Sequence, residues 1–311
     1  MRRWLSFLMA SMLLAPVLPG VAQTNFVVSD YATFLQALAT TASITNFQAN
    51  AQIVLAAGQT IATPNGLVID GGANNVTFSG ANVTRIFHVR PKTTNTFVNL
   101  VIENGAATQG GAIFNEGTLI ISNCVLTANT ATNVSGANGV NAGHNGNGTD
   151  GGQGLGAVAG AIFSKGPLTI LYSKFTNNAA KGGNGGNGGS GAAQFVFGDS
   201  GGNGGNGGGA SGGAIYAVGS SNYIFATLFE NNTCLCGAGG LGGAAGSAQF
   251  ASSGGSGGVG GSGDGGALFC NGRLRMDGCF FQANGVTGGA TAPAQGVGND
   301  NPMNGGAGGF A

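Results

Sequence analysis

Apolar and polar residues alternate in short runs along most of the chain. The same spacing returns in successive stretches, with apolar residues at Leu119, Ile121, Cys124 and Leu126, at Leu168, Ile170 and Phe175, and at Leu274, Met276, Cys279 and Phe281. Charged residues lie between apolar positions of the last stretch, at Arg273 and Arg275, and mark its outer face. A period of two residues is typical of β-strands that bury one face, and no helical period separates the stretches. The pattern therefore predicts many short strands around a core.

The strands belong to a repeat that occurs four times. Each copy opens with two small residues, an Ala, an aliphatic residue and an aromatic residue, at 110–114, 159–163, 212–216 and 265–269. The second small residues, Gly111, Gly160, Gly213 and Gly266, are 49, 53 and 53 residues apart. An apolar-x-x-Asn motif follows 18 or 19 residues later and ends at Asn129, Asn178, Asn232 and Asn284, and a half-copy ends at Asn104. Such a fixed period indicates a repeat architecture.

Equal spacing and short strands favour a solenoid of β-coils, in which parallel strands of successive coils lie ~4.8 Å apart. The step from Asn104 to Asn129 is 25 residues, which corresponds to one short coil. If the repeated Asn points inward at one turn of every coil, the residues stack and satisfy one another's amides. This ladder would contain Asn104, Asn129, Asn178, Asn232 and Asn284. The paired glycines permit a tight turn in which a Cβ would clash.

Glycine is concentrated in the second part of the chain. Of the 65 glycines, 59 follow residue 104, so we divide the mature chain into 23–104, with the cap and first coils, and 105–311, with the glycine-rich repeats. Most of these glycines lie in insertions, each of which replaces the short corner 105–109 in a later repeat. Because all the insertions leave the coils at the same corner, they should project from one side. Triplets such as those in 182–187 and 201–206 suggest extended arms of polyproline-II type, with glycine faces free for packing. Flexible glycine-rich loops are the alternative.

The repeat motifs also carry a family resemblance. The strings GGAIF and LIISNCVLTANTA in 110–131, and GAIFSKGPLTILYSKFTNNAA in 160–180, resemble the repeats of polymorphic outer membrane proteins. That resemblance implies a right-handed parallel β-helix of the pectate-lyase-like class over about residues 26–285. It also implies a short amphipathic capping helix at Tyr31–Ala39. Members of the family are surface proteins, adhesins and autotransporter passengers, so the resemblance implies a surface role.

The first 22 residues have the order of a secretory signal peptide. The basic residues Arg2 and Arg3 precede an apolar run at 4–18, and Gly20 and Ala22 suit cleavage after Ala22. The run falls short of the ~20 residues that span a membrane, and Pro16 interrupts it. We therefore predict a signal peptide at 1–22 and no membrane span in the mature chain. The protein is expected to be extracellular or on the outer cell surface.

Charge is scarce and balanced. The chain has 10 Lys+Arg and 10 Asp+Glu, and charged residues make up 6% of it. A net charge of zero gives no electrostatic reason to bind nucleic acid or an anionic membrane. We therefore expect no nucleic-acid partner.

Carboxylates are the groups on which a carbohydrate-cleaving β-helix would depend, often with calcium. Four of them occur once per insertion but at different distances from the next motif: Asp150, Asp199, Asp264 and Asp300. The string GGSGDGG at 260–266 misses the calcium-binding nonapeptide repeat, because its Asp is one place early. Asp70 is expected at a turn, and the others are scattered, with no two carboxylates in one repeat register: Asp30, Glu103, Glu116, Glu230 and Asp277.

The histidines complete this set of candidates. His88 beside a strand and His144 in an insertion stand alone, without the spacing of metal ligands or a nucleophile to serve. We therefore predict no catalytic, cofactor-binding or metal site, and no cofactor.

The five cysteines do not form the pattern of a disulfide scaffold. Cys124 and Cys279 hold one repeat position ~14 Å apart, too far to bond, and should behave as small buried residues. One bridge among Cys234, Cys236 and Cys270 remains open.

These observations predict an exported, non-catalytic, structural or adhesin-like surface protein whose insertions form a display face. Its partners would be surface glycans, other cells or copies of itself. The alternative is a polysaccharide lyase or glycoside hydrolase on the same fold, since a fold does not fix a function. The sequence ends at Ala311 inside what resembles a fourth insertion, so we expect a piece of a longer array.

Overall fold

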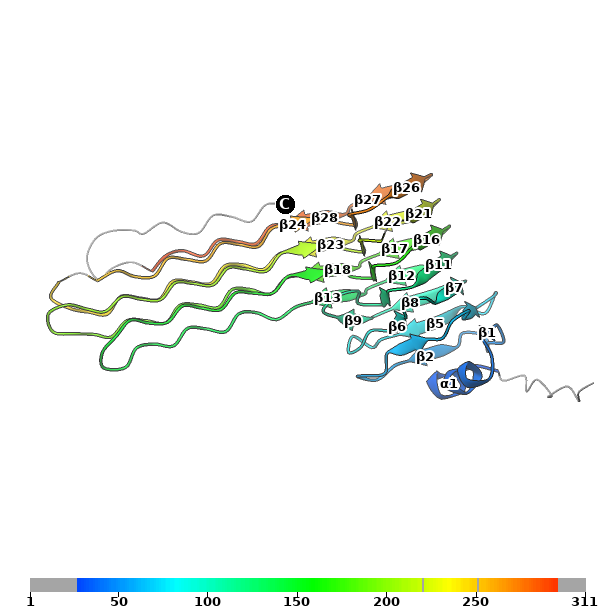
Figure 1. Cartoon of the computed structure of the whole chain (residues 1–311), viewed down its shortest axis with the longest axis horizontal. Coiled ribbons are helices and arrows are strands. Elements are labelled where there is room, and N and C mark those ends of the chain that lie inside the picture. Colours follow the sequence, from blue (N-terminus) through cyan, green and yellow to red (C-terminus); the bar gives the residue numbers. More distant parts are fainter. Residues whose placement is uncertain (1–26, 220, 251, 296–311) are drawn as a thin grey trace, which may run out of the picture.

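In the computed structural model the chain winds into a parallel β-helix, and three long arms project from one side of it (Figure 1). The structure describes residues 27–219, 221–250 and 252–295. The predicted all-β parallel fold with one-sided projections is confirmed. The predicted signal peptide, Asp300 and the end of the chain lie outside the described residues.

One helix occurs among the described residues, α1 (Tyr31–Thr40), and it covers the first coil as predicted. Asp30 caps it, because its Oδ1 accepts a hydrogen bond from the Thr33 N–H at 2.9 Å and the Thr33 hydroxyl reaches back to the cap. The buried ring of Phe34 meets Phe78 edge to face, 5.0 Å between centroids. The helix thus closes the apolar interior at the start of the solenoid.

The coils stack into parallel sheets, to which each coil adds one strand. The first sheet has seven strands: β1 (Ser43–Ile44), β4 (Val68–Asp70), β7 (Thr94–Val98), β11 (Thr118–Ser122), β16 (Leu168–Leu171), β21 (Asn222–Phe225) and β26 (Leu274–Asp277). The second also has seven: β2 (Gln52–Val54), β5 (Val76–Ser79), β8 (Leu100–Glu103), β12 (Val125–Thr127), β17 (Lys174–Thr176), β22 (Leu228–Glu230) and β27 (Phe280–Gln282).

The third sheet has six strands: β3 (Ile61–Thr63), β6 (Phe87–Val89), β10 (Ile113–Asn115), β15 (Ile162–Ser164), β20 (Ile215–Ala217) and β25 (Leu268–Cys270). Two smaller sheets lie where the arms leave and return. One contains β9 (Ala106–Ala107), β13 (Thr130–Thr132), β18 (Ala179–Lys181), β23 (Thr233–Leu235) and β28 (Gly285–Thr287). The other contains β14 (Ala157–Val158), β19 (Ala210–Ser211) and β24 (Gly263–Asp264).

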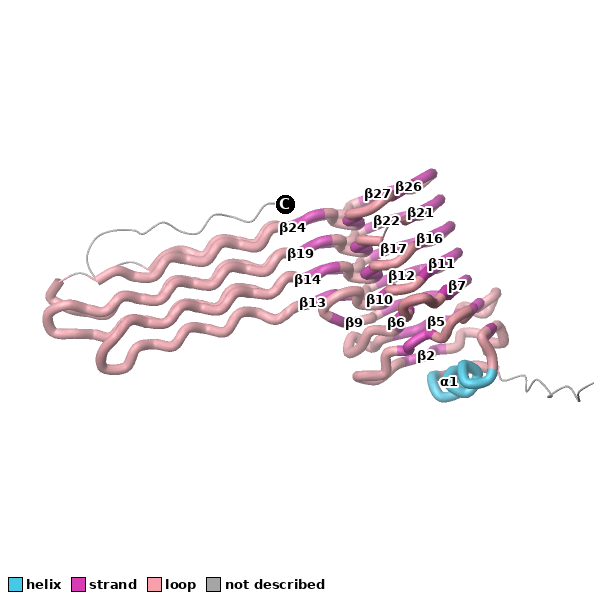
Figure 2. Tube along the Cα trace, in the orientation of Figure 1, coloured by secondary structure: helices cyan, strands magenta, loops and turns pink. Residues whose placement is uncertain are grey.

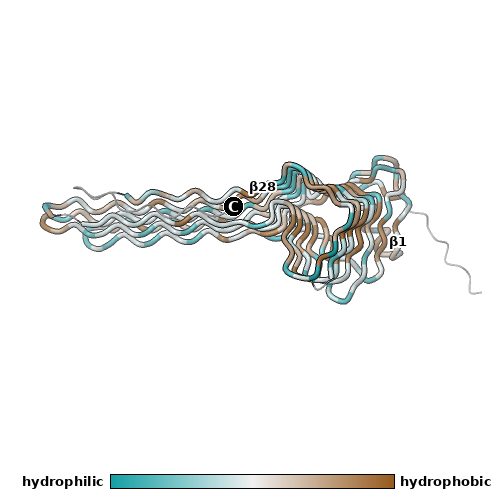
Figure 3. The backbone as a smooth tube through the Cα atoms, turned by 90° about the horizontal axis from the view of Figure 1, so that it is seen from above, coloured by the Kyte–Doolittle hydropathy of each residue, from teal (hydrophilic) through white to brown (hydrophobic). Residues whose placement is uncertain are grey.

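The alternating residues belong to one continuous core of buried apolar side chains. Figure 3 shows that apolar positions stack in register from coil to coil. Identical or similar side chains stack from coil to coil, as Phe175 does on Phe229 at 5.1 Å between ring centroids. Ile113, Ile162 and Ile215 occupy one register position and are fully buried. The period of two in the sequence therefore corresponds to the pleat of the coils.

The predicted asparagine ladder is present over four coils. The Asn129 Nδ2 donates to the Asn178 Oδ1 at 3.0 Å, and the same bond links Asn178 to Asn232 and Asn232 to Asn284 at 2.9 Å each. Each Oδ1 also accepts the main-chain N–H of the preceding Asn. The ladder thus satisfies buried polar groups inside the core, as expected.

Asn104 is not part of this ladder, so that prediction is wrong by one residue. Ala106 pairs with Thr130, which places Gly105 opposite Asn129, and the Gly105 N–H donates to the Asn129 Oδ1 at 2.8 Å. Asn104 instead takes a left-handed conformation with φ +53° at the corner, where Ala128 of the next coil has the same φ. The short coil is consequently 24 residues long, as the pairing of Val101 with Val125 shows.

The two small residues that open each repeat have different structural roles. The first has a positive φ, at +56° for Gly110, +61° for Ala159 and +64° for Gly212. The second packs against the next coil, since a Cβ on Gly111 would overlap the Gly160 carbonyl oxygen. The turn predicted at this motif is confirmed, with one residue chosen for conformation and the other for space.

The insertions are extended arms rather than flexible loops in the part of the chain described. Arm 1 spans 133–156, arm 2 spans 182–209 and arm 3 spans 236–262, and 288–295 begins another outgoing segment. Each goes out and returns, and the arms lie side by side in two layers (Figures 1 and 2). At ~3.1 Å per residue, the twelve outgoing residues 182–193 extend about 37 Å from the coils.

Candidate functional site

The arms are built from residue triplets in which each position has its own environment. The outgoing half of arm 2 reads GGN, GGN, GGS at 182–190, and its return half reads GGN, GGN at 201–206. Arm 3 reads GGL, GGA at 239–244 going out and GGS, GGV, GGS at 254–262 coming back. Three residues complete one turn of a polyproline-II helix, so each position faces one direction along the arm.

The first and second N–H groups bond to neighbouring arm segments. The first-position N–H of Gly185 donates to the Ala238 carbonyl oxygen of arm 3 at 2.8 Å. The second-position N–H of Gly186 donates to the Gly152 carbonyl oxygen of arm 1, and that of Gly205 donates to the Gly186 carbonyl oxygen, both at 2.8 Å. Polyproline-II chains have no internal hydrogen bonds, so these contacts between segments hold the arms together.

The glycines at these two positions leave no room for a side chain in the triplets of arm 2. A Cβ on Gly185 would overlap the Gly205 carbonyl oxygen, and a Cβ on Gly186 would overlap the Ala137 carbonyl oxygen of the arm below. The glycine excess in the insertions is therefore a packing requirement. This confirms the expectation that glycine faces pack arm against arm.

The third position carries the side chains that the bundle displays. Its N–H is satisfied by an asparagine of the previous arm: Asn184 Oδ1 accepts the Ala238 N–H at 2.9 Å, and Asn203 Oδ1 accepts the Ser256 N–H at 3.0 Å. Each amide thereby fixes the next arm through its oxygen. Both asparagines are exposed, and the described residues give their Nδ2 groups no hydrogen-bond partner. The repeated Asn therefore links neighbouring arms through its side-chain oxygen and leaves its amide N–H groups available to a ligand.

Displayed side chains form rows on two faces of the bundle. The outgoing face carries Ser135, Asn138 and Asn141, then Asn184, Asn187 and Ser190, then Ala238, Leu241 and Ala244. The return face carries Asp150, Asn203 and Asn206, then Ser256 and Val259. Along an arm the rows repeat every three residues, about 9.3 Å. The two faces are thus regular, nearly uncharged arrays of amide, hydroxyl and small apolar groups.

Arm 1 departs from the triplet rule because it is the first arm, and the part of the chain that the structure describes places no arm below it. Its second positions carry Val134, Ala137 and Val140 going out, and Thr149 and Leu155 coming back. Val134 is 62% exposed, Val140 70% and Leu155 52%. Side chains are tolerated there since the face that meets the preceding arm in arms 2 and 3 is open in arm 1.

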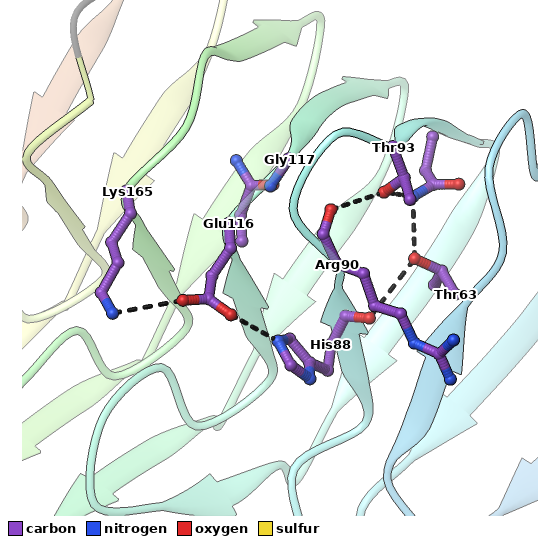
Figure 4. A network of polar contacts seen from close by, with 9 residues as sticks. Thr63, His88, Arg90, Thr93, Glu116, Gly117 and Lys165 are labelled. Atoms are coloured by element: carbon purple, nitrogen blue, oxygen red, sulfur yellow. Dashed lines mark hydrogen bonds and ion pairs between the residues drawn. The ribbon is translucent and has the colours of Figure 1, made fainter.

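A polar network on the outer face of the six-stranded sheet was not predicted. The His88 Nε2 lies 2.9 Å from Glu116 Oε2, and the Lys165 Nζ lies 3.3 Å from Glu116 Oε1 (Figure 4). These hydrogen bonds and the nearby cation lower the pKa of Glu116, against a smaller effect of partial burial. The His88 ring also stacks on Phe114 at 5.1 Å, below an outer aromatic ladder of Phe114, Phe163, Tyr216 and Phe269.

This network lacks the parts of a nucleophilic site. Glu116 is the only hydrogen-bond partner that the described residues give to the His88 ring, and Thr63 binds the His88 main-chain oxygen instead. His88 belongs to strand β6 itself, and not beside it as predicted. The register explains why it was missed: Glu116 follows β10, whose Asn115 pairs with Val89, one residue after His88.

The aspartates considered as candidate site residues have structural roles, and three of them accept hydrogen bonds from main-chain N–H groups. Asp150 Oδ1 accepts the Asn203 N–H at 2.6 Å and so replaces an asparagine in a displayed row. Asp199 Oδ2 accepts the Gly146 N–H at 2.7 Å, and Asp264 lies in β24 at the base of arm 3. Asp70 Oδ1 accepts the Gly72 N–H at 2.8 Å, which is the turn that was predicted.

Two pairs of carboxylates do share a register, contrary to the prediction. Glu103 aligns with Glu230 through Thr127 and Thr176, and Asp70 aligns with Asp277 through four intervening coils. Three coil steps of ~4.8 Å still separate the closer pair by about 14 Å. No general acid and base are therefore brought together by these alignments, because an acid–base pair lies within about 10 Å.

Other candidates remain apart. His144 lies near the tip of arm 1, where its carbonyl oxygen accepts a bond from the Gln194 side chain at 3.0 Å. Within the described residues, no cluster of three or more His, Cys, Asp and Glu side chains is placed to hold a metal ion. In the same residues, no helix has the length and apolar character needed to cross a membrane.

The five cysteines, all within the described ranges, are free, so no bridge forms among Cys234, Cys236 and Cys270. Burial raises the pKa of the Cys124 and Cys234 thiols to about 12, and that of Cys236 in the same direction. These thiols stay protonated at neutral pH and are poor nucleophiles. Cys124 and Cys279 act as packed side chains of the main core, as expected.

No protein-family model matches the chain, and no match is found among curated proteins or among solved structures. The resemblance to polymorphic outer membrane protein repeats therefore stays a prediction.

Proposed function

We propose that this protein is an exported structural or adhesin-like protein of the cell surface, with no catalytic site of its own, and that the arm bundle is its display face. The observation that supports the proposal is that the positions of each triplet have different roles. In the triplets of arms 2 and 3 the first two residues are glycines that hold the arms together, and the third is presented outward in rows. Such a surface offers many weak, repeated contacts instead of one pocket.

The chemistry of the rows favours glycans as the partner. Asparagine and serine present hydrogen-bond donors and acceptors, and Leu241 and Val259 add small apolar contacts. Arms 2 and 3 carry only one charged residue, Asp199. Uncharged polar rows of this kind match the hydroxyl groups of neutral sugars, with repeated sites adding up through multivalency.

The test compares the full chain with a matched variant that lacks the arms. Coil β9–β10 turns the same corner without an arm, because Thr108 is followed by Gln109, which pairs with Val158. Removing 133–157, 182–210 and 236–263 therefore joins each outgoing strand to its return strand in the same way, and ending the chain at Thr287 removes the further outgoing segment that begins at 288. We refer to this protein as the armless variant.

Binding of the full chain and the armless variant to an array of neutral and acidic glycans, and to whole cells, measures the display function. We expect the full chain to bind and the armless variant to lose that binding while remaining folded. Equal binding by both would place adhesion outside the arms. A parallel assay of depolymerisation of acidic polysaccharides, with and without calcium, tests the enzymatic alternative, and turnover would overturn the proposal.

A further inference from the structure

Exposed aromatic residues gather at the far ends of arms 2 and 3. Phe195 is 89% exposed, Phe197 69% and Phe250 53%, and Val196 beside them is 41% exposed. Both ends lie beyond the end of arm 1 and far from the coils (Figure 1). An apolar patch at the outermost point of a soluble surface indicates a contact with another body.

The main chain around these rings is fixed by hydrogen bonds. The Gln194 N–H donates to the Ser247 carbonyl oxygen at 3.0 Å, and the Phe250 N–H donates to the Val196 carbonyl oxygen at 3.0 Å. The Gln194 side chain also bonds to Asn145 Oδ1 of arm 1 at 2.6 Å. The rings therefore stand on a bonded platform that joins the three arms.

Stability of the tip explains two of the rings but not the third. Phe197 and Phe250 stack with 5.4 Å between centroids, so their contact holds arms 2 and 3 together. Phe195 makes no ring contact among the described residues. Phe195 therefore adds no ring packing to the tip, and its exposed ring extends the apolar patch of Phe197, Phe250 and Val196.

The low charge and narrow shape of the tips favour one kind of partner surface. Across 182–209 and 236–262 the one charged side chain is Asp199, whose Oδ2 is turned back onto the Gly146 N–H and the Gln194 amide. The tip is a narrow projection, so a protein partner would need a matching hollow, whereas the interface of a lipid bilayer accepts any convex apolar shape. Phenylalanine is among the residues that interfacial protein segments bury at the boundary between headgroups and acyl chains.

We propose that the tips of arms 2 and 3 insert Phe195, Phe197 and Phe250 into the interfacial region of a lipid bilayer, with no requirement for anionic lipid. The arms would then hold the β-helix about 37 Å from the membrane, the length of 182–193 in polyproline-II geometry. This proposal is independent of glycan binding by the sides of the arms.

The first experiment measures flotation of the full chain with vesicles of phosphatidylcholine alone and with added phosphatidylglycerol. We expect binding to both, and binding about tenfold weaker for Phe195→Ser, since a partly buried phenylalanine ring is lost. The matched control is Val140→Ser, because Val140 is 70% exposed on the side of arm 1, and it should bind as the unchanged protein does.

The second experiment reports where the tip lies. The chain's one tryptophan is Trp4, so Phe195→Trp places a probe at the tip in the mature protein, and Val140→Trp places one on the side of an arm. Phosphatidylcholine vesicles should shift the emission of the first to shorter wavelength and leave the second unchanged. Binding only to anionic vesicles, unchanged binding of Phe195→Ser, or tip-dependent capture of a protein without vesicle binding would each overturn the proposal.

Discussion

Asparagine satisfies main-chain N–H groups both inside the coils and on the surface of the arms, but the two sites differ in burial. Asn178 is fully buried, and its Oδ1 accepts two bonds from Asn129 while its Nδ2 donates to the Leu126 carbonyl oxygen at 2.9 Å. Asn203 lies on an exposed arm face and accepts a single bond from the Ser256 N–H. Water can replace the hydrogen bond of exposed Asn203 but cannot reach the hydrogen bonds of buried Asn178.

We therefore predict that Asn178→Ala destabilises the coils by about 3 kcal/mol, because buried groups are left without partners. The matched change Asn203→Ala should cost about 1 kcal/mol or less, since water reaches the freed N–H. Urea unfolding followed by circular dichroism measures both. Equal losses of stability in the two variants would contradict the assignment of the ladder to the core.

The Glu116 network gives a pH-dependent prediction at the same scale. Hydrogen bonding to His88 and Lys165 lowers the pKa of Glu116 in the folded protein from its ordinary value of 4.5. The stabilisation is then fully present above pH 4.5 and is lost as the pH falls through the lowered folded pKa. We expect Glu116→Gln to lower the Tm by about 1–2 °C at pH 6, since the network is partly exposed, and to have no effect at pH 2. A difference in Tm that persists unchanged at pH 2 would refute this explanation.

Within an arm, the triplet rule predicts very different results for neighbouring residues. In Gly186→Ala the added methyl group would overlap the Ala137 carbonyl oxygen, so arm 2 must separate from arm 1. Asn187 is a displayed residue, and Asn187→Ala removes one bond, to the Leu241 N–H at 2.9 Å. Hydrogen exchange should show lost protection across arm 2 amides in Gly186→Ala and retained protection in Asn187→Ala. Coil amides should exchange alike in both, and equal protection of arm 2 would contradict the packing.

The elements differ in how far the sequence predicts them. Alternation reveals the coils and period three reveals the arms, because both are local patterns with one residue type at a fixed place. The asparagine ladder was misplaced at Asn104, since the half-copy before the first motif aligns only through the pairing of Ala106 with Thr130. The contact of His88 with Glu116 is set by the register of two coils whose length no repeat motif marks. The tips contain the pairs Gln194-Phe195 and Gln249-Phe250, but the sequence does not show that these rings are exposed, because their exposure depends on the arms being straight.

At the scale of the whole molecule, the main core and the arm bundle share no residues. The buried cluster runs from Val28 to Ala267 and omits every residue of arms 1, 2 and 3. The arms are instead held by hydrogen bonds between their own segments, and a small cluster of Ala180, Ala210 and Cys234 lies where they meet the coils. The apolar core that stabilises the β-helix therefore does not depend on the arms.

We therefore expect the armless variant to keep its β-helix, with a Tm within about 5 °C of the full chain, because the apolar core that stabilises the coils is untouched. Its maximum dimension in small-angle X-ray scattering should fall by about 37 Å, the length of one outgoing arm in polyproline-II geometry. Circular dichroism should retain the strand signal. If the variant unfolds or aggregates, the arms take part in holding the coils together, since the joined corner is one that β9 and β10 already use without an arm. An unchanged maximum dimension would instead show that the arms fold back along the coils in solution.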